Sequence, residues 1–330
     1  MSAQIGVSFD GFASFDDAVA LARDAVAAGA TGLWMADHLG YREAILSCLG
    51  FALATPGARV VPTAISPYLR HPMPTAMQMA TLAEAAPGRV AIAVGIGNPL
   101  FLGESGESID KPVRVVREFV EALRALWSGE PVEQDGLRFR LKGARMMFRP
   151  RAPIPIYLAP IREQMLRLAG RIADGAVLSA GISAAYARRS LAFVAQGARD
   201  AGREPQRLHS AGYIFLMACD DKRRAVETVR RKLAFVLRNR FLDENIAITG
   251  IPLDQDAIIA AIARRDLDGA AQLVSDDAVE AFGVAGDVRT CCERLAAFAD
   301  AGLKELVLLL SGEAADLQTG LNVIREMKSQ

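Results

Sequence analysis

The chain has 330 residues, of which 52% are hydrophobic and 23% charged, so it is long and apolar enough to bury a large core. Lysine plus arginine equals aspartate plus glutamate at 38 each, and this zero net charge excludes a global field that would favour nucleic acid or an anionic membrane. Residues 1–10 lack the pattern of a signal peptide, and no apolar run is long enough to span a bilayer. We therefore expect a cytoplasmic protein with no nucleic-acid or membrane partner.

Short apolar runs alternate with longer amphipathic runs along most of the chain. Continuous apolar runs are typical of parallel strands that are covered on both faces. Strands that alternate with helices in this way predict an α/β fold, a (β/α)8 TIM barrel that forms a single domain over residues 1–330. The predicted strands are Ile5–Phe9, Gly32–Ala36, Arg59–Ile65, Arg89–Gly95, Ile154–Ala159, Gly175–Ser179, Ser210–Ala218 and Glu305–Leu310. The predicted helices are Ser14–Ala28, Glu43–Ala54, Pro72–Ala86, Lys111–Ser128, Arg162–Ala173, Ala184–Ala201, Lys222–Arg238, Val288–Ala301 and Ala314–Met327.

Two segments depart from the plain repeat. Residues 129–151 are rich in glycine, proline and charge, and they predict a hairpin or lid around Val132–Leu141. Residues 241–282 contain two helical patterns, Leu253–Arg264 and Leu267–Leu273. Because long structureless loops are rare in compact domains, we expect a structured insertion over the barrel mouth there.

The cysteines and histidines do not form a metal-binding pattern. The four cysteines include no Cys-x-x-Cys motif, so we expect reduced thiols, and three scattered histidines make a zinc site improbable. Cys48 lies on an apolar helix face and is expected in the core. His71 is interpreted as a loop residue and His209 as structural.

Asp37 and His38 come directly after the second predicted strand. If the strand belongs to a barrel, they lie at the end where active sites are built. One interpretation is chemical, with His38 as a hydrogen-bonding group or an acid near neutral pH. The other is that Asp37 only caps the helix that follows. Position alone does not decide between the two.

Polar or glycine-rich segments follow the other strands as well, and on one barrel rim they would build one pocket. They are Ser66 to Pro72, Gly95 to Pro99, Ala159-Pro160-Ile161-Arg162 and Ser179-Ala180-Gly181-Ile182-Ser183.

The turn Gly95-Ile96-Gly97 has two interpretations. It is either a simple tight turn or a flat backbone surface that a planar ring can approach closely. The segments Ala159–Arg162 and Ser179–Ser183 can each offer backbone N–H groups and a helix N-terminus to a phosphate. Arg162 is either a solvated arginine or a bidentate phosphate contact.

These residues resemble the bacterial luciferase-like superfamily of flavin- and deazaflavin-dependent oxidoreductases, and within it most the methylenetetrahydromethanopterin reductases, which use coenzyme F420. The resemblance runs along nearly the whole chain, and no single motif carries it. The matching stretches are Trp34-Met35-Ala36-Asp37-His38, Ser66-Pro67-Tyr68-Leu69-Arg70-His71-Pro72, Gly95-Ile96-Gly97, Lys111-Pro112, Leu126-Trp127-Ser128-Gly129-Glu130, Pro155-Ile156-Tyr157, Ala169-Gly170 with Ala173-Asp174-Gly175-Ala176, and Asp276 to Gly286.

The resemblance implies a TIM barrel with insertions that binds F420 or FMN with the ring over the barrel mouth. It implies a non-prolyl cis peptide behind the ring, here Thr63–Ala64 or one residue away. It also places the cofactor phosphate near Ala159–Arg162 and Ser179–Ser183. Family members and the neutral charge favour a homo-oligomer.

Three positions depart from the reductase pattern. Ser8 replaces a carboxylate on the first strand, Asn98 replaces the acidic residue after the glycine turn, and Ala159–Arg162 replaces a glycine-rich phosphate turn. Carboxylates near the reacting carbon would assist protonation of a pterin, so their loss bears on the substrate. We expect Asn98 and Ser8 to contribute neutral hydrogen bonds.

The resulting hypothesis is an F420-dependent oxidoreductase that transfers a hydride to or from a small-molecule substrate, with Asp37, His38 and Asn98 as catalytic residues. One alternative is an FMN-dependent monooxygenase of the same superfamily. Another is a flavin-binding barrel without catalysis, which the missing carboxylates motivate.

Overall fold

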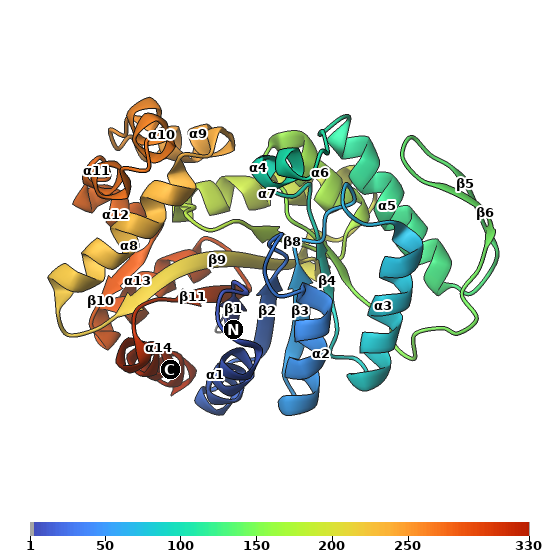
Figure 1. Ribbon diagram of the computed structural model, residues 1–330, viewed down its shortest axis with the longest axis horizontal. Coiled ribbons are helices and arrows are strands. Elements are labelled where there is room, and N and C mark those ends of the chain that lie inside the picture. Colours follow the sequence, from blue (N-terminus) through green and yellow to red (C-terminus); the bar gives the residue numbers. More distant parts are fainter. Residues whose placement is uncertain (1–2, 330) are drawn as a thin grey trace.

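The computed structural model describes residues 3–329 and has a mostly parallel, nearly closed barrel at its centre (Figure 1). Hydrogen-bonded neighbours follow the order β3-β2-β1-β11-β9-β8-β7-β4. The barrel strands are β1 (Gln4–Phe9), β2 (Gly32–Ala36), β3 (Arg59–Thr63), β4 (Ile92–Val94), β7 (Ile156–Leu158), β8 (Gly175–Leu178), β9 (His209–Ala218) and β11 (Glu305–Leu310). The prediction of a TIM barrel is confirmed.

The first and last strands of this order, β3 and β4, complete the barrel, and they are joined by isolated β-bridges instead of a continuous ladder. Val60 pairs with Val90 near the start of both strands, and Ile65 pairs with Val94 near their ends. Backbone hydrogen bonds accompany these bridges, for example from the Gly95 N–H to the Ile65 carbonyl at 3.1 Å. All these barrel strands run parallel, so their carboxyl ends meet on one rim, where the predicted site residues lie.

The helices predicted between the strands are present, with ends that shift by one or two residues. Several shifts arise because an expected first residue is the N-cap: Ser14 and Glu43 each accept a hydrogen bond from a backbone N–H of the first turn. The helices are α1 (Phe15–Ala28), α2 (Ala44–Ala54), α3 (Pro72–Ala85), α5 (Pro112–Trp127), α6 (Glu163–Ile172), α7 (Ala184–Asp200), α8 (Lys222–Leu237), α13 (Val288–Asp300) and α14 (Ala314–Ser329).

Both expected departures from the repeat are structured. Residues 132–144 form the antiparallel hairpin β5 (Val132–Asp135) and β6 (Arg140–Ala144), which stands at one end of the molecule in Figure 1. Residues 241–282 form a helical insertion at the other end, with the two predicted helices as α10 (Gln255–Ala263) and α11 (Leu267–Gln272). Elements not predicted are α4 (Pro99–Glu104), η1 (Pro205–Arg207), η2 (Arg240–Leu242), α9 (Asp243–Thr249), α12 (Asp276–Phe282) and β10 (Val284–Gly286).

Side chains fill the inside of the barrel. Trp34 is fully buried and packs with Val61, Tyr157 and Val307 from three other strands. Below this layer, at the start of β11, the Glu305 carboxylate accepts hydrogen bonds from Trp34 Nε1 and His209 Nε2, each at 2.8 Å, and forms an ion pair with Arg59. The interior of the barrel is therefore a packed core.

His209 is structural in this arrangement, as its sequence position indicated. All four cysteines are free and buried, which agrees with the expectation of reduced thiols. Within residues 3–329, no helix is both long enough and apolar enough to cross a membrane, and no group of three or more metal-ligating side chains is found.

Candidate active site at the barrel mouth

The floor of the mouth is made of very small residues. The peptide bond Thr63–Ala64 is cis, at the first of the positions that the resemblance implied. A Cβ atom built on Gly95 would lie 3.0 Å from the Ala64 Cβ and 3.2 Å from the Ala159 Cβ. Three neighbouring loops thus meet here with nothing larger than a methyl group. Such a floor has the shape that a planar ring needs for close approach.

Gly97 closes the same turn. It has a φ of +89°, and a Cβ there would lie 3.1 Å from the Ser66 hydroxyl. That hydroxyl donates a 2.9 Å hydrogen bond to the Ile96 carbonyl, which ties the loop after β3 to the loop after β4. The structure therefore brings Thr63, Ala64 and the predicted glycine turn together at one place.

Asp37 is held in an ion pair. Its two carboxylate oxygens accept hydrogen bonds of 2.9–3.2 Å from the Arg70 guanidinium, which also reaches Glu43 at 2.8 Å. Burial disfavours the charged form of Arg70, but the two carboxylates outweigh this, so the pKa of Arg70 is raised. Asp37 thus anchors the loop after β3 and does not cap the next helix, whose N-cap is Glu43.

His38 follows Asp37 directly in the chain and is half-buried. Its Nδ1 lies 3.1 Å from the Asp10 carbonyl oxygen. Because a carbonyl oxygen only accepts, Nδ1 carries a hydrogen, and in the neutral ring Nε2 then has a free lone pair. No described residue of the chain hydrogen-bonds to Nε2, so it is available to a substrate oxygen as acceptor or, when protonated, as donor.

Asn98 has a local structural task. It is the N-cap of α4, and its Oδ1 accepts a 3.0 Å hydrogen bond from the Leu100 N–H. Its amide nitrogen is the part left for a ligand. Asn98 was expected to contact the substrate, and only its amide nitrogen is left for such a contact.

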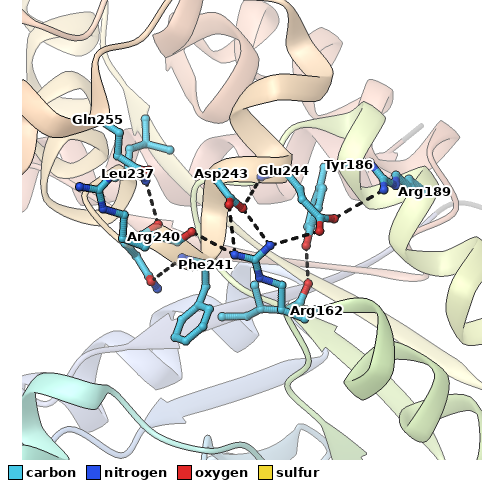
Figure 2. Close-up of polar contacts among 11 residues, drawn as sticks. Arg162, Tyr186, Arg189, Leu237, Arg240, Phe241, Asp243, Glu244 and Gln255 are labelled. Atoms are coloured by element: carbon cyan, nitrogen blue, oxygen red, sulfur yellow. Dashed lines mark hydrogen bonds and ion pairs between the residues drawn. The ribbon is translucent and has the colours of Figure 1, made fainter.

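Arg162 has partners that the sequence did not suggest (Figure 2). Its guanidinium lies 3.0 Å from Asp243 and 3.1 Å from Glu244, and it stacks over the Phe241 ring at 5.7 Å. These carboxylates belong to the helical insertion. A phosphate would have to displace them, so the interpretation of Arg162 as a free phosphate ligand has no support in this geometry. Ile161 contributes its carbonyl oxygen, which accepts a hydrogen bond from the Tyr186 hydroxyl.

The second predicted phosphate loop is braced by the next residue of the insertion. Asn245 is fully buried, and its Oδ1 accepts hydrogen bonds from the Ser183 N–H at 2.9 Å and the Ser183 hydroxyl at 3.2 Å. Its amide nitrogen donates to the Gly181 carbonyl at 2.8 Å. Ser179 and Ala180 lie half-buried just before this anchored turn. Three consecutive insertion residues therefore hold both loops.

Tyr213 on β9 reaches into the top of the barrel interior. Its hydroxyl oxygen is buried without a hydrogen-bond partner among residues 3–329. Burial raises the pKa of Tyr213 far above its usual value, and the side chains of Thr63 and Ser8 lower it only in part. Tyr213 is thus a neutral phenol close to the side chains of Ser8 and Thr63.

Several residues of this site could not be predicted from the sequence. Arg70 belongs to a motif that the sequence analysis noted, but its ion pairs with Asp37 and Glu43 were not predicted. Asn245 carried no signal, because it lies far along the chain from its partners. Phe12 and Tyr41 beside His38 each lie in a loop that follows a predicted strand, and this position was a usable signal.

The sequence profile described as luciferase-like monooxygenase matches residues 2–305, so the chain belongs to the luciferase-like family, whose members are oxidoreductases. It is 28% identical over 84% of its length to a 5,10-methylenetetrahydromethanopterin reductase of Methanolobus tindarius, covering 85% of that protein. It is 30% identical over 76% of its length to an F420-dependent glucose-6-phosphate dehydrogenase of Beutenbergia cavernae, covering 77% of that protein.

Solved structures agree on the fold. The coenzyme F420-dependent tetrahydromethanopterin reductase of Methanopyrus kandleri superposes with a TM-score of 0.89 at 24% identity, over 99% of this chain and 98% of that one. An F420-dependent secondary alcohol dehydrogenase superposes with a TM-score of 0.83, also at 24% identity and over the same shares of the two chains. The family resemblance seen in the sequence is confirmed.

Proposed function

We propose that this protein is a coenzyme F420-dependent oxidoreductase that transfers a hydride at the mouth of its barrel. The observation that carries the proposal is the floor formed by Ala64, Gly95 and Ala159, which has no side chain larger than a methyl and suits a planar ring. The F420-dependent relatives named above support the deazaflavin as the ring.

In this proposal the chain supplies binding and orientation while the cofactor supplies the hydride chemistry. The floor residues back the ring, and the Asp37–Arg70 ion pair fixes the loop that carries the cis peptide. The anchored loops at Ala159–Arg162 and Ser179–Gly181 offer backbone N–H groups to the cofactor phosphate. His38 Nε2 presents a hydrogen bond to the substrate.

The similarity to methylenetetrahydromethanopterin reductases directs the search to one-carbon pterins and, more widely, to enones. Ser8 and Asn98 place no carboxylate at the two positions noted above, and we propose that His38 supplies the proton that the substrate needs.

A titration of the purified protein with F420 and with FMN tests the cofactor, following ligand fluorescence and thermal unfolding. A ligand that binds only the folded protein adds about 2.7 kcal/mol of stability at a hundredfold excess over its dissociation constant. We expect this shift with F420. A shift with FMN alone would replace the proposal by an FMN-dependent monooxygenase. Tight binding of F420 without turnover of any pterin, enone or alcohol would support the non-catalytic barrel.

A further inference from the structure

A cavity opens at the end of the barrel opposite to the mouth. It has a volume of about 740 Å³, within the range of small-molecule sites. Its walls are the carboxyl ends of α5 and α6, residues 150–155 before β7, and Arg203 in the loop after α7. These segments lie where the barrel strands begin, so the cavity is separate from the candidate active site, which lies where the strands end. We call it the amino-end cavity.

Positive charge is concentrated around the amino-end cavity although the chain has no net charge. Asp174 is the one acidic residue among the described residues that line it, and four are arginines: Arg124, Arg151, Arg171 and Arg203. Asp174 is already engaged, because its carboxylate accepts a 3.0 Å hydrogen bond from Arg124 and a 2.8 Å one from the Ile156 N–H. No carboxylate of the described cavity wall thus balances the other three arginines.

Arg203 is tied to the end of α6. Its guanidinium donates hydrogen bonds of 2.6 Å to the carbonyl oxygens of Gly170 and Ala173. These oxygens are neutral, so the bonds fix the guanidinium without cancelling its charge. Burial is the main cause that lowers the pKa of Arg203, while Asp174 raises it and the like charge of Arg124 lowers it. An anion in the cavity would therefore stabilise the charged form of this side chain.

Arg151 and Arg171 have weaker partners than Arg203. Arg171 lies 3.7 Å from a carboxylate oxygen of Asp200, which Arg167 approaches at the same distance. That separation is too long for a hydrogen bond. Arg151 is exposed, and none of the ion pairs found within residues 3–329 includes it. Capping of α6 accounts for Arg203, but these two side chains have no comparable structural task among the described residues and are available to an anion.

The rest of the cavity wall is mostly apolar. Trp127 lies half-buried at the end of α5, and its Nε1 donates a 3.1 Å hydrogen bond to the Ala76 carbonyl, which fixes the indole ring. Three prolines, Pro150, Pro153 and Pro155, stiffen the segment before β7 because each restricts its own φ. A wall that is rigid before a ligand arrives lowers the entropic cost of binding. The cavity therefore offers cations and a preformed apolar surface side by side.

We propose that the amino-end cavity binds a small molecule that carries phosphate groups. Its phosphate oxygens pair with Arg151, Arg171 and Arg203, because the planar guanidinium matches the geometry of phosphate. An organic body, where the ligand has one, lies against Trp127. This site goes beyond the proposed function, since it requires neither F420 nor hydride transfer.

Isothermal titration calorimetry of the whole protein with ADP, inorganic diphosphate and adenosine tests the site. We expect ADP to bind and adenosine, which lacks phosphate, not to bind measurably. The double variant Arg151→Gln with Arg171→Gln should weaken ADP binding about tenfold or more, since it removes two charge-assisted contacts. The matched control is Arg23→Gln, because Arg23 is likewise exposed and outside the ion pairs found within residues 3–329, but lies on α1. The control should bind ADP like the unchanged protein.

The diphosphate arm identifies the source of the phosphate. Tighter binding of ADP than of diphosphate supports an organic phosphate as the ligand, whereas diphosphate that binds at least as tightly as ADP supports a site for inorganic phosphate groups. The inference is overturned if neither compound binds saturably, if adenosine binds as tightly as ADP, or if the double variant binds both phosphate compounds like the unchanged protein.

Titration of the same three proteins with F420 separates this inference from the proposed function. We expect all three to bind F420 equally, because the amino-end cavity lies away from the mouth, and we expect ADP to stay bound when one equivalent of F420 is added. Release of ADP by that F420 would place ADP at the mouth and overturn the inference. If F420 binds none of the three while ADP binding depends on the two arginines, the proposed cofactor fails and the inference stands.

Discussion

The shape of the floor at the barrel mouth depends on the absence of a side chain at Gly95. Gly95 lies between Ala64 and Ala159 without positive φ, so other residues could adopt its backbone conformation. What excludes them is space, because a Cβ would already crowd both methyl groups. The glycine is therefore needed for the shape of the floor.

We predict that Gly95→Val folds but binds F420 more weakly. The added methyl groups would push into the floor and cost about 1–3 kcal/mol of stability by overpacking. They would also lift the ring, so we expect the dissociation constant to rise about tenfold or more, which corresponds to about 1.4 kcal/mol. Fluorescence titration measures it. Gly103→Ala on α4, where a Cβ meets nothing within 4 Å, should bind as before. Unchanged affinity in Gly95→Val would mean that the ring does not lie on this floor.

Residue types at strand ends could be predicted from the sequence, but their partners could not. Asp37-His38 and the glycine turn were placed correctly at the rim because strand and loop alternate regularly. The ion pair from Asp37 to Arg70 and the pairing of Arg162 with Glu244, 82 residues away, depend on how loops pack. No local pattern in the sequence encodes such contacts.

At the scale of elements, α9 acts as a brace between two loops. Its first residues, Asp243, Glu244 and Asn245, contact the loop after β7 and the loop after β8 (Figure 2 shows the first two). The insertion was predicted as structured, but α9 itself was missed because seven residues are too few for a clear helical period. Its Asp243 and Glu244 also fit the positive end of a helix.

Asn245→Ala should loosen the loop after β8. The change leaves the buried Ser183 N–H and the Gly181 carbonyl without partners, at a cost of about 1–3 kcal/mol for each unsatisfied group. We expect faster amide hydrogen exchange at residues 181–186, measured by mass spectrometry, and weaker F420 binding. Asn322→Ala, an exposed position on α14, should leave exchange in this loop unchanged. If amide hydrogen exchange at residues 181–186 stays slow in Asn245→Ala, the loop after β8 is not held in place by α9.

At the scale of the whole molecule, Glu305 joins four strands from inside. It lies on β11, accepts hydrogen bonds from Trp34 of β2 and His209 of β9, and forms an ion pair with Arg59 of β3. Burial disfavours its charged form, yet the hydrogen bond from His209 and the charge of Arg59 outweigh burial and lower the pKa of Glu305. An acid with a lowered pKa stabilises the folded state at neutral pH.

Glu305→Gln should therefore destabilise the barrel by about 3 kcal/mol at pH 7, since it leaves the half-buried Arg59 guanidinium without its buried counter-ion. Because the folded pKa lies below the unfolded one, the contribution is full above the unfolded pKa and is lost as pH falls through the folded pKa. The difference in the free energy of unfolding between the unchanged protein and the variant, measured by urea denaturation, should shrink over that acidic range. Glu293→Gln, an exposed partner of Arg289, should cost about 0–1 kcal/mol at every pH. If this difference for Glu305→Gln does not change with pH, the ionised Glu305 carboxylate does not stabilise the fold in the way described.

The pairing of β1 with β11 has a consequence for synthesis on the ribosome. The barrel cannot close until β11 has emerged, because β1 lies between β2 and β11 in the sheet. Until then β1 presents an open edge that can pair with another chain. Contacts between such distant segments also form slowly. The complete chain has no net charge, so charge repulsion gives it little protection against self-association. Yield of folded protein should therefore depend on translation speed and on chaperones that shield β1 until its last neighbour arrives.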